Sequence, residues 1–230
     1  MKTWSICIII SIVFVGMGLG AISKPQTVEA RPGPQALDRS LVQIVRTWEK
    51  QKGSVRVTVE EMSLGTVIGT HRILTHNHFT GGLGTQPNET LSIVDQAGRI
   101  FPASISEVKG VALDKSTLLL DVPATLTTPP AVLADQQLIG QLAPNAWLTV
   151  DYWDDANSRF ATKAFQVLQQ QGGIVILADP EHIINLGDSG GSAYFEGRLI
   201  GNTKSYNADM QRNALGSFNV ALVPAQISAQ

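Results

Sequence analysis

The chain has 230 residues, of which 17 are basic and 19 acidic, and its formal net charge at pH 7 is −2. This balance argues against nucleic acid or an anionic membrane surface as the main partner, because both select strongly basic proteins. The only cysteine, Cys7, lies in the first apolar stretch, so the rest of the chain must be stabilised by packing and not by disulfides. The length suits one domain, or two small barrels that share a core.

The amino terminus has the pattern of a targeting segment. Lys2 precedes an almost wholly apolar run, residues 4–19, and small residues that fit cleavage sites follow at Ser23 and Ala30. The alternative is an uncleaved membrane anchor, because a run of about 20 apolar residues can cross a bilayer. We expect residues 1–23 to be a signal peptide or anchor, 24–36 a linker and 37–230 a domain that is secreted, periplasmic or on the cell surface.

The first element after the linker is predicted to be a short helix over about residues 38–50. Asp38 can cap its start, and Lys50 to Gly53 gives a basic end and a stop. Apolar residues recur at helical spacing, namely Leu41, Ile44, Val45 and Trp48.

From Ser54 onwards the pattern changes to a period of two, which is typical of strands. Apolar residues alternate with polar ones from Val55 to Val59, and Ser63-Leu64-Gly65 is expected to turn the chain. Further short strands are predicted at 66–75, 91–94, 99–105, 118–122, 147–152, 164–168, 174–177, 193–195, 199–202 and 218–223. Strands at this spacing indicate a barrel or a sandwich.

The stretch Gly187-Asp188-Ser189-Gly190-Gly191 is a candidate nucleophile site, followed by a predicted hairpin that turns at Glu196-Gly197. A serine hydroxyl is a poor nucleophile unless a base lies within about 3 Å. A glycine-rich turn can also aim N–H groups at a developing oxyanion. The alternative is an ordinary polar turn, since Gly, Asp and Ser are common in turns.

The stretch Ile73-Leu74-Thr75-His76-Asn77-His78 delivers two histidines from an apolar strand into a loop. Histidine is well suited to move a proton near neutral pH. One alternative is a pair of solvated loop histidines, and another is a metal site built from His71, His76 and His78. The lack of a cysteine or carboxylate at zinc-site spacing nearby speaks against the metal site.

Together, these two stretches resemble the motifs of the trypsin/chymotrypsin family of serine peptidases. The family's Gly-Asp-Ser-Gly-Gly motif is matched in full, and its Leu-Thr-Ala-Ala-His motif is matched at Leu74, Thr75 and His78. The resemblance implies an all-β fold of two six-stranded antiparallel β-barrels of the chymotrypsin type, here about 54–130 and 131–230, after the short helix. It also implies that His78, and not His76, is the general base of Ser189.

The resemblance points to Asp114 as the third catalytic residue, although Lys115 stands where the family has an apolar residue. Aligning the following leucines instead places Ser116 at the acid position, and Asp121 is a second candidate.

The resemblance further implies an oxyanion hole made by the backbone N–H groups of Gly187 and Ser189. Ile183, six positions before the serine, would line the substrate pocket and would not favour Lys or Arg side chains. Ser205 and Tyr206 resemble the family's substrate-binding strand. The activating sequence Ile-Val-Gly-Gly is absent, so Asp188 needs a partner other than a freed amino terminus.

The sequence therefore predicts a secreted serine endopeptidase that cleaves peptide bonds through an acyl-enzyme and needs no cofactor or metal. Its expected partner is a peptide or protein substrate and its expected state a monomer, with membrane contact only through an uncleaved amino-terminal segment. The alternative function is a catalytically inactive member of the same fold that binds peptides or proteins.

Overall fold

The computed structural model describes residues 40–77, 83–185, 187–204, 216–223 and 227. The strands of its first half are β1 (Leu41–Lys52), β2 (Val55–Gly69), β3 (Arg72–His76), β4 (Thr90–Asp95), β5 (Ile100–Ala103), β6 (Lys109–Ala112) and β7 (Thr117–Asp121). The second half begins with helix α1 and continues with strands, namely α1 (Gln136–Ile139), β8 (Trp147–Asp154), β9 (Arg159–Gln171), β10 (Ile174–Ala178), β11 (Ser192–Phe195), β12 (Arg198–Lys204) and β13 (Ser217–Leu222).

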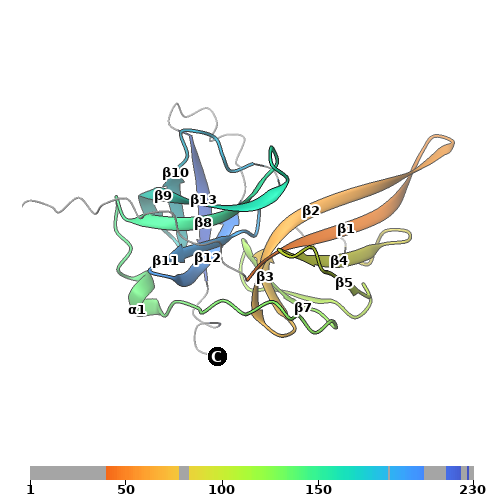
Figure 1. The fold of residues 1–230 in the computed structure, drawn as a ribbon, viewed down its shortest axis with the longest axis horizontal. Helices are drawn as coiled ribbons and strands as arrows, with labels where there is room; N and C mark the ends of the chain where they lie inside the picture. The colour runs from red at the N-terminus through yellow and green to blue at the C-terminus, as the bar shows by residue number, and fades with distance from the viewer. Residues whose placement is uncertain (1–39, 78–82, 186, 205–215, 224–226, 228–230) are drawn as a thin grey trace, which may run out of the picture.

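The two halves form two β-structures that lie side by side (Figure 1). The first is a seven-stranded sheet of order β5-β4-β1-β2-β3-β7-β6, a half-barrel whose two edge strands are consecutive in the chain. The second is a closed barrel of order β10-β13-β12-β11-β8-β9. All of the strand pairs are antiparallel. The predicted all-β architecture of two antiparallel halves is confirmed, with seven strands in the first half and a closed six-stranded barrel in the second.

The predicted helix over 38–50 is wrong for the described residues, because β1 begins at Leu41 and pairs with β2 over its whole length. Its inward-facing positions follow a period of two, with Val42, Ile44 and Arg46 all buried. Apolar residues occur on both faces of this strand, and that is why their spacing also fits a helix. Strand β1 therefore lies in the sheet of the first half, ahead of residue 54 in the chain.

The predicted turn at residues 63–65 is also wrong, because these residues lie inside β2. Gly65 is a close-packing position: a β-carbon there would lie 2.5 Å from Ile73 Cγ2 and 2.9 Å from Ile44 Cδ1. Glycine within a strand often marks such a close approach and need not mark a turn.

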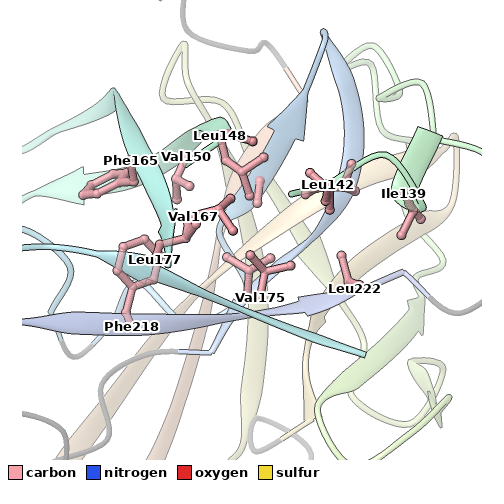
Figure 2. Packing of buried hydrophobic residues seen from close by; sticks show 14 of the residues in the cluster. Ile139, Leu142, Leu148, Val150, Phe165, Val167, Val175, Leu177, Phe218 and Leu222 are labelled. Carbon is pink, nitrogen blue, oxygen red and sulfur yellow. The ribbon is translucent and has the colours of Figure 1, made fainter. Parts of the chain in front are cut away.

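Separate apolar cores fill the two halves. In the second barrel, Phe165 and Phe218 pack edge to face at 4.9 Å within a cluster of aliphatic side chains (Figure 2). A smaller cluster joins the halves, with Leu74 of β3 packed among Tyr194 and Leu199 of the second barrel. This third cluster brings the strand that leads to His78 against the strands that follow Ser189.

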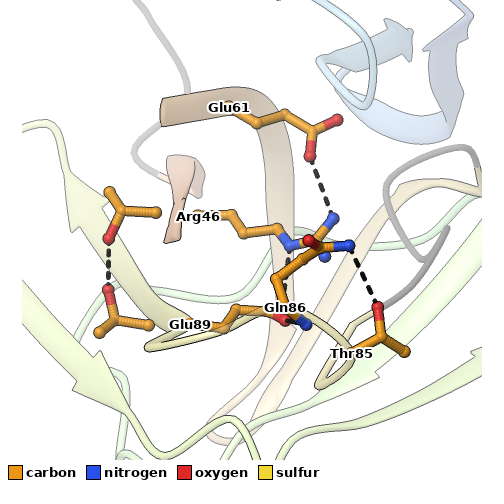
Figure 3. A network of polar contacts seen from close by, with 7 residues as sticks. Arg46, Glu61, Thr85, Gln86 and Glu89 are labelled. Carbon is orange, nitrogen blue, oxygen red and sulfur yellow. Dashed lines mark hydrogen bonds and ion pairs between the residues drawn. The ribbon is translucent and has the colours of Figure 1, made fainter. Parts of the chain in front are cut away.

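The hairpin of β1 and β2, here called the ribbon, projects well beyond the rest of the first half (Figure 1). β1 pairs with β4 only as far as Thr47 opposite Thr90, and β2 pairs with β3 only from Gly65 onwards. The outer ribbon is therefore two strands wide. At its base, Arg46 Nε donates to Glu89 Oε1 at 2.7 Å and Arg46 Nη1 to Glu61 Oε2 at 3.3 Å (Figure 3).

The proposed targeting segment (1–23) and linker (24–36) lie outside the described residues. Within the part of the chain that the structure describes, no helix is long and apolar enough to cross a membrane.

Candidate active site

The candidate serine turn, residues 187–191, connects the segment after β10 to the start of β11 and lies between the two halves. Gly187 and Gly190 have φ angles of +103° and +88°, which L-residues with side chains rarely adopt. Ser189 is buried, with 1% of its surface exposed. Two of the glycines are thus required by the backbone path of the turn.

One side of the serine turn is held by Thr203 of β12, in the second barrel. Gly190 N donates to Thr203 O at 2.7 Å, and Thr203 N donates to Gly191 O at 2.8 Å. The Thr203 hydroxyl donates to Asp188 O at 2.5 Å. These three bonds fix the turn to its own barrel on both sides of Ser189.

The other side is held by β2, in the first half of the molecule. The Ser189 carbonyl oxygen accepts hydrogen bonds from Leu64 N at 2.8 Å and from Ser63 Oγ at 2.6 Å. A further hydroxyl pair, Thr66 Oγ1 and Ser192 Oγ, spans the boundary at 2.6 Å. The segment that carries the candidate nucleophile is therefore bonded to both halves.

The two motifs found in the sequence meet at Gly190. A β-carbon at this position would overlap both Leu64 O and Thr75 Oγ1. Thr75 lies in β3, three positions before His78, and its hydroxyl donates to Leu64 O at 2.6 Å. His78 itself lies outside the described residues, so the contact is established for the strand that leads to it.

Asp114 and the three residues after it, here called the acid turn (residues 114–117), adjoin the same histidine segment. Asp114 Oδ1 accepts hydrogen bonds from the backbone N–H groups of Ser116 at 2.6 Å and Thr117 at 2.7 Å. Asn77, the neighbour of His78, donates from Nδ2 to Asp114 O at 3.0 Å and from its backbone N to Ser116 O at 3.1 Å. The sequence does not indicate a function for Asn77, because its hydrogen bond is to Asp114, 37 positions further along the chain.

Asp121, the second acid candidate, lies at the far end of the same strand pair. It stands opposite Arg72, the first residue of β3, and forms an ion pair with it at 3.2 Å. The chain leaves β3 towards His78 from the opposite end, after His76. This placement favours the acid turn over Asp121.

Asp188 is hydrogen-bonded to backbone N–H groups in place of a freed amino terminus. Its Oδ1 accepts from Trp153 N at 2.7 Å and its Oδ2 from Asn185 N at 2.8 Å. Burial of this carboxyl group raises its pKa from 3.8 to about 7, against the lowering effect of the two backbone bonds. Nearby Asp155 and Asp179 raise the pKa as well. Two backbone amides therefore occupy both oxygens of the aspartate that precedes the candidate nucleophile.

The candidate pocket residue Ile183 is part of a loop held by Asp179. The buried Asp179 carboxylate accepts from Ile183 N at 3.0 Å and from Ile184 N at 2.9 Å. The Ile183 side chain packs against the second core. The other two residues expected to bind substrate, Ser205 and Tyr206, lie outside the described residues.

Two hollows lie between the halves beside these turns. One borders the serine turn and is lined by Gln43, Met62, Ser63, Leu64, Trp153, Asp155, Gly187 and Asp188. The other borders the acid turn and is lined by residues 114–116, Gln136, Ile139, residues 172–174 and residues 221–223. Both provide concave surface where a ligand could contact the candidate site.

The alternative metal site at His71, His76 and His78 is not supported for its two described members. His71 precedes β3, where its Nδ1 lies 3.2 Å from Ala124 O, and His76 ends the strand. At a rise of about 3.3 Å per residue, the two histidines are too far apart to share one ion. Among the described residues, the structure contains no cluster of three or more His, Cys, Asp or Glu side chains arranged to hold a metal.

Comparisons with known proteins identify the fold. No protein-family model matches the chain, and no curated protein matches it in sequence. Among solved structures, HL collagenase is similar with a TM-score of 0.62 and 13% identity, covering 85% of this chain and 93% of its own.

Two inactivated protease paralogues of the scabies mite are similar as well. Paralogue S-I1 has a TM-score of 0.57 and 14% identity, with 86% of this chain and 96% of its own covered. Paralogue S-D1 has a TM-score of 0.57 and 14% identity, with 79% and 86% covered. The chain therefore has the double-barrel fold of chymotrypsin-like serine proteases.

Proposed function

We propose that the protein is a serine endopeptidase in which Ser189 is the nucleophile and His78 its general base. The observation that carries the proposal is the contact of Gly190 with Thr75 and Leu64, because it joins the serine turn to the strand that leads to His78. An ordinary polar turn is expected at the surface. This turn is instead buried against β3, the strand of the other half that leads to His78.

In the proposed reaction, His78 takes the proton from the Ser189 hydroxyl as the oxygen attacks a peptide carbonyl carbon. The N–H groups of Gly187 and Ser189 stabilise the resulting oxyanion. His78 then gives its proton to the leaving amine, and an acyl-enzyme remains on Ser189. A water molecule, deprotonated by His78, hydrolyses this ester and regenerates the enzyme.

We assign the third catalytic position to Asp114. Its carboxylate lies in the turn that is bonded to Asn77, next to His78. A carboxylate beside the imidazole would hold its tautomer and stabilise the imidazolium that forms during the reaction.

We infer a preference for small or apolar side chains at the cleaved position. Ile183 offers no charge to a basic side chain, and its neighbour Asp179 uses its carboxylate to bind two backbone N–H groups. The hollow beside Gly187 has apolar walls at Met62 and Trp153, which suit an apolar residue on the leaving-group side.

We also propose that the protein is exported and that its signal peptide is removed by cleavage after Ser23 or after Ala30. Mass spectrometry of the protein recovered outside the cytoplasm would then give an amino terminus at Lys24 or Arg31. An intact amino terminus in the membrane fraction would favour the anchor instead.

A second candidate function is a catalytically inactive member that binds peptides or proteins. Two observations favour it: two of the similar structures are inactivated protease paralogues, and Oδ1 of Asp114 already accepts two backbone hydrogen bonds. In this alternative the hollows between the halves would bind a partner without cleaving it.

Labelling with a fluorophosphonate probe separates the two functions. The wild-type protein should be labelled at Ser189, and Ser189→Ala and His78→Ala should not be. Ser54→Ala, at the exposed tip of the ribbon, is the matched serine control and should be labelled like the wild type. A folded wild-type protein that is never labelled would overturn the enzyme and favour the binding alternative.

A further inference from the structure

The carbonyl oxygen of Ser189 accepts two hydrogen bonds from the other half of the molecule. It accepts from Leu64 N and from Ser63 Oγ, two groups on adjacent residues of β2. A carbonyl oxygen has two lone pairs, and both are engaged here. Ser63 is buried, with 1% of its surface exposed, so its hydroxyl bond is shielded from water.

The same stretch of β2 is bonded to the strand that leads to the proposed base. β2 pairs with β3 at Gly65 opposite Thr75 and at Thr66 opposite Leu74. The Thr75 hydroxyl also donates to Leu64 O. Ser63 and Leu64 both donate to the serine turn, and Leu64 O also accepts from Thr75 of β3, the strand that leads to His78.

We propose that Ser63 is a positioning residue for the nucleophile, an assignment that rests on the proposed function. Its hydroxyl and the Leu64 N–H together fix the orientation of the Ser189–Gly190 peptide relative to β3. The N–H end of this peptide is bonded to the second barrel, since Gly190 N donates to Thr203 O at 2.7 Å, and the Ser63 hydroxyl adds a second donor from the first half at its carbonyl end. The fixed peptide keeps the Ser189 hydroxyl aligned with the strand that leads to His78.

Loss of the Ser63 hydroxyl is expected to change alignment more than folding. The Ser189 carbonyl would keep its bond to Leu64 N, so no buried acceptor is left unpaired. The hydroxyl pair of Thr66 and Ser192 would still join the halves. Because a small misplacement of reacting groups can reduce a rate by up to about a hundredfold, the effect should appear in the chemical step.

The test uses Ser63→Ala, with Ser63→Thr as the conservative rescue and Thr47→Ala as the matched control. Thr47 shares a hydroxyl pair with Thr90 at 2.7 Å at the base of the ribbon, so its variant loses the same kind of bond elsewhere. Labelling rates at increasing fluorophosphonate concentration give a maximal rate constant and a half-saturating concentration for each variant. Thermal unfolding in the same buffer gives the folded fraction.

For folded Ser63→Ala, the maximal labelling rate should fall about tenfold or more, while the half-saturating concentration stays unchanged. Ser63→Thr should restore the rate, and Thr47→Ala should match the wild type. If the added methyl group prevents Ser63→Thr from folding, Ser63→Cys replaces it, and its weaker donor should give an intermediate rate.

A wild-type rate in folded Ser63→Ala would overturn the positioning role and leave the proposed function intact. A loss confined to the half-saturating concentration, or an equal loss in folded Ser63→Ala and its rescue variant, would also overturn it. Absence of labelling in the wild type would overturn both the proposed function and the role of Ser63.

Discussion

Gly190 and Thr75 are in contact across the boundary between the two halves, so closely that a β-carbon at Gly190 would overlap the Thr75 hydroxyl oxygen. The position is restricted twice, because its φ of +88° also disfavours a side chain. The serine turn can therefore approach β3 this closely only because Gly190 has no β-carbon.

Gly190→Ala should therefore be among the most damaging single substitutions in the chain. We expect a loss of more than about 3 kcal/mol in the free energy of unfolding, because backbone strain and overpacking add at one site. Denaturant titration measures the loss. Gly197→Ala is the control, since its φ is +73° but no atom lies within 4 Å of the added carbon, and it should lose only about 1 kcal/mol. Equal losses in the two variants would contradict the overlap.

Asp188 should make stability depend on pH. Because its pKa rises from 3.8 in the unfolded chain to about 7 in the folded state, the folded state binds the proton more tightly. The contribution of this group to the free energy of unfolding should therefore be largest below about pH 4, fall as pH rises to about 7, and then level off. Asp188→Asn stays neutral and should lack this decrease, as denaturant titrations between pH 4 and 8 would reveal. The same slope in both proteins would contradict the raised pKa.

The ion pair of Arg46 and Glu89 should contribute strongly to stability, because 4% and 1% of these side chains are exposed. Glu89→Gln leaves the buried guanidinium with a weaker partner, and we expect a loss of about 3 kcal/mol in the free energy of unfolding. Glu49→Gln is the exposed control. Its pair with Arg56, at 3.6 Å and with side chains 37% and 76% exposed, should contribute less than about 1 kcal/mol.

The same pair has its own pH signature. Burial alone would raise the pKa of Glu89, but the hydrogen bond from Arg46 and two backbone bonds bring it below the ordinary value of 4.5. The stabilisation is therefore present above about pH 4.5 and is lost as pH falls further, whereas Glu89→Gln should not show this loss. Parallel acid unfolding of the two proteins would contradict the assignment.

Asp114→Asn tests the third catalytic position with little structural change, because the amide keeps an oxygen that can accept from Ser116 N and Thr117 N. We expect the rate of fluorophosphonate labelling to fall about a hundredfold or more, since the imidazole loses its carboxylate partner. Asp121→Asn should leave the rate unchanged because Asp121 pairs with Arg72. The opposite ranking would move the acid to Asp121.

Much of the fold could be predicted because it depends on local patterns. The alternation of apolar residues located the strands of the second barrel, and the Glu196-Gly197 turn has the positive φ angles, +50° and +73°, that a tight hairpin requires. Leu41 to Trp48 was misassigned, because apolar side chains on both faces of β1 fit two periodicities. Strand pairing resolves that ambiguity, and it depends on residues far along the chain.

The candidate site was predictable only where it is a continuous motif. The serine turn is one such motif, whereas the sequence wrongly predicts a turn at Gly65 because its close neighbours, Ile44 and Ile73, are distant in sequence. The distant partner of Asp188 is the backbone N–H of Trp153, 35 positions away. Such a partner has no sequence signature because every residue except proline carries a backbone N–H.

The ribbon has a consequence for how the molecule opens. Between Lys50 and Val57 the described residues pair only through bonds between β1 and β2, whereas Glu49 N, nearer the base, also donates to Pro87 O. This segment should exchange its amide hydrogens sooner than the base of the same strands, and nicking by an added protease should begin at its tip. Gly53 and Ser54 therefore offer a position where a tag or a fluorescent group could be inserted without disturbing either barrel.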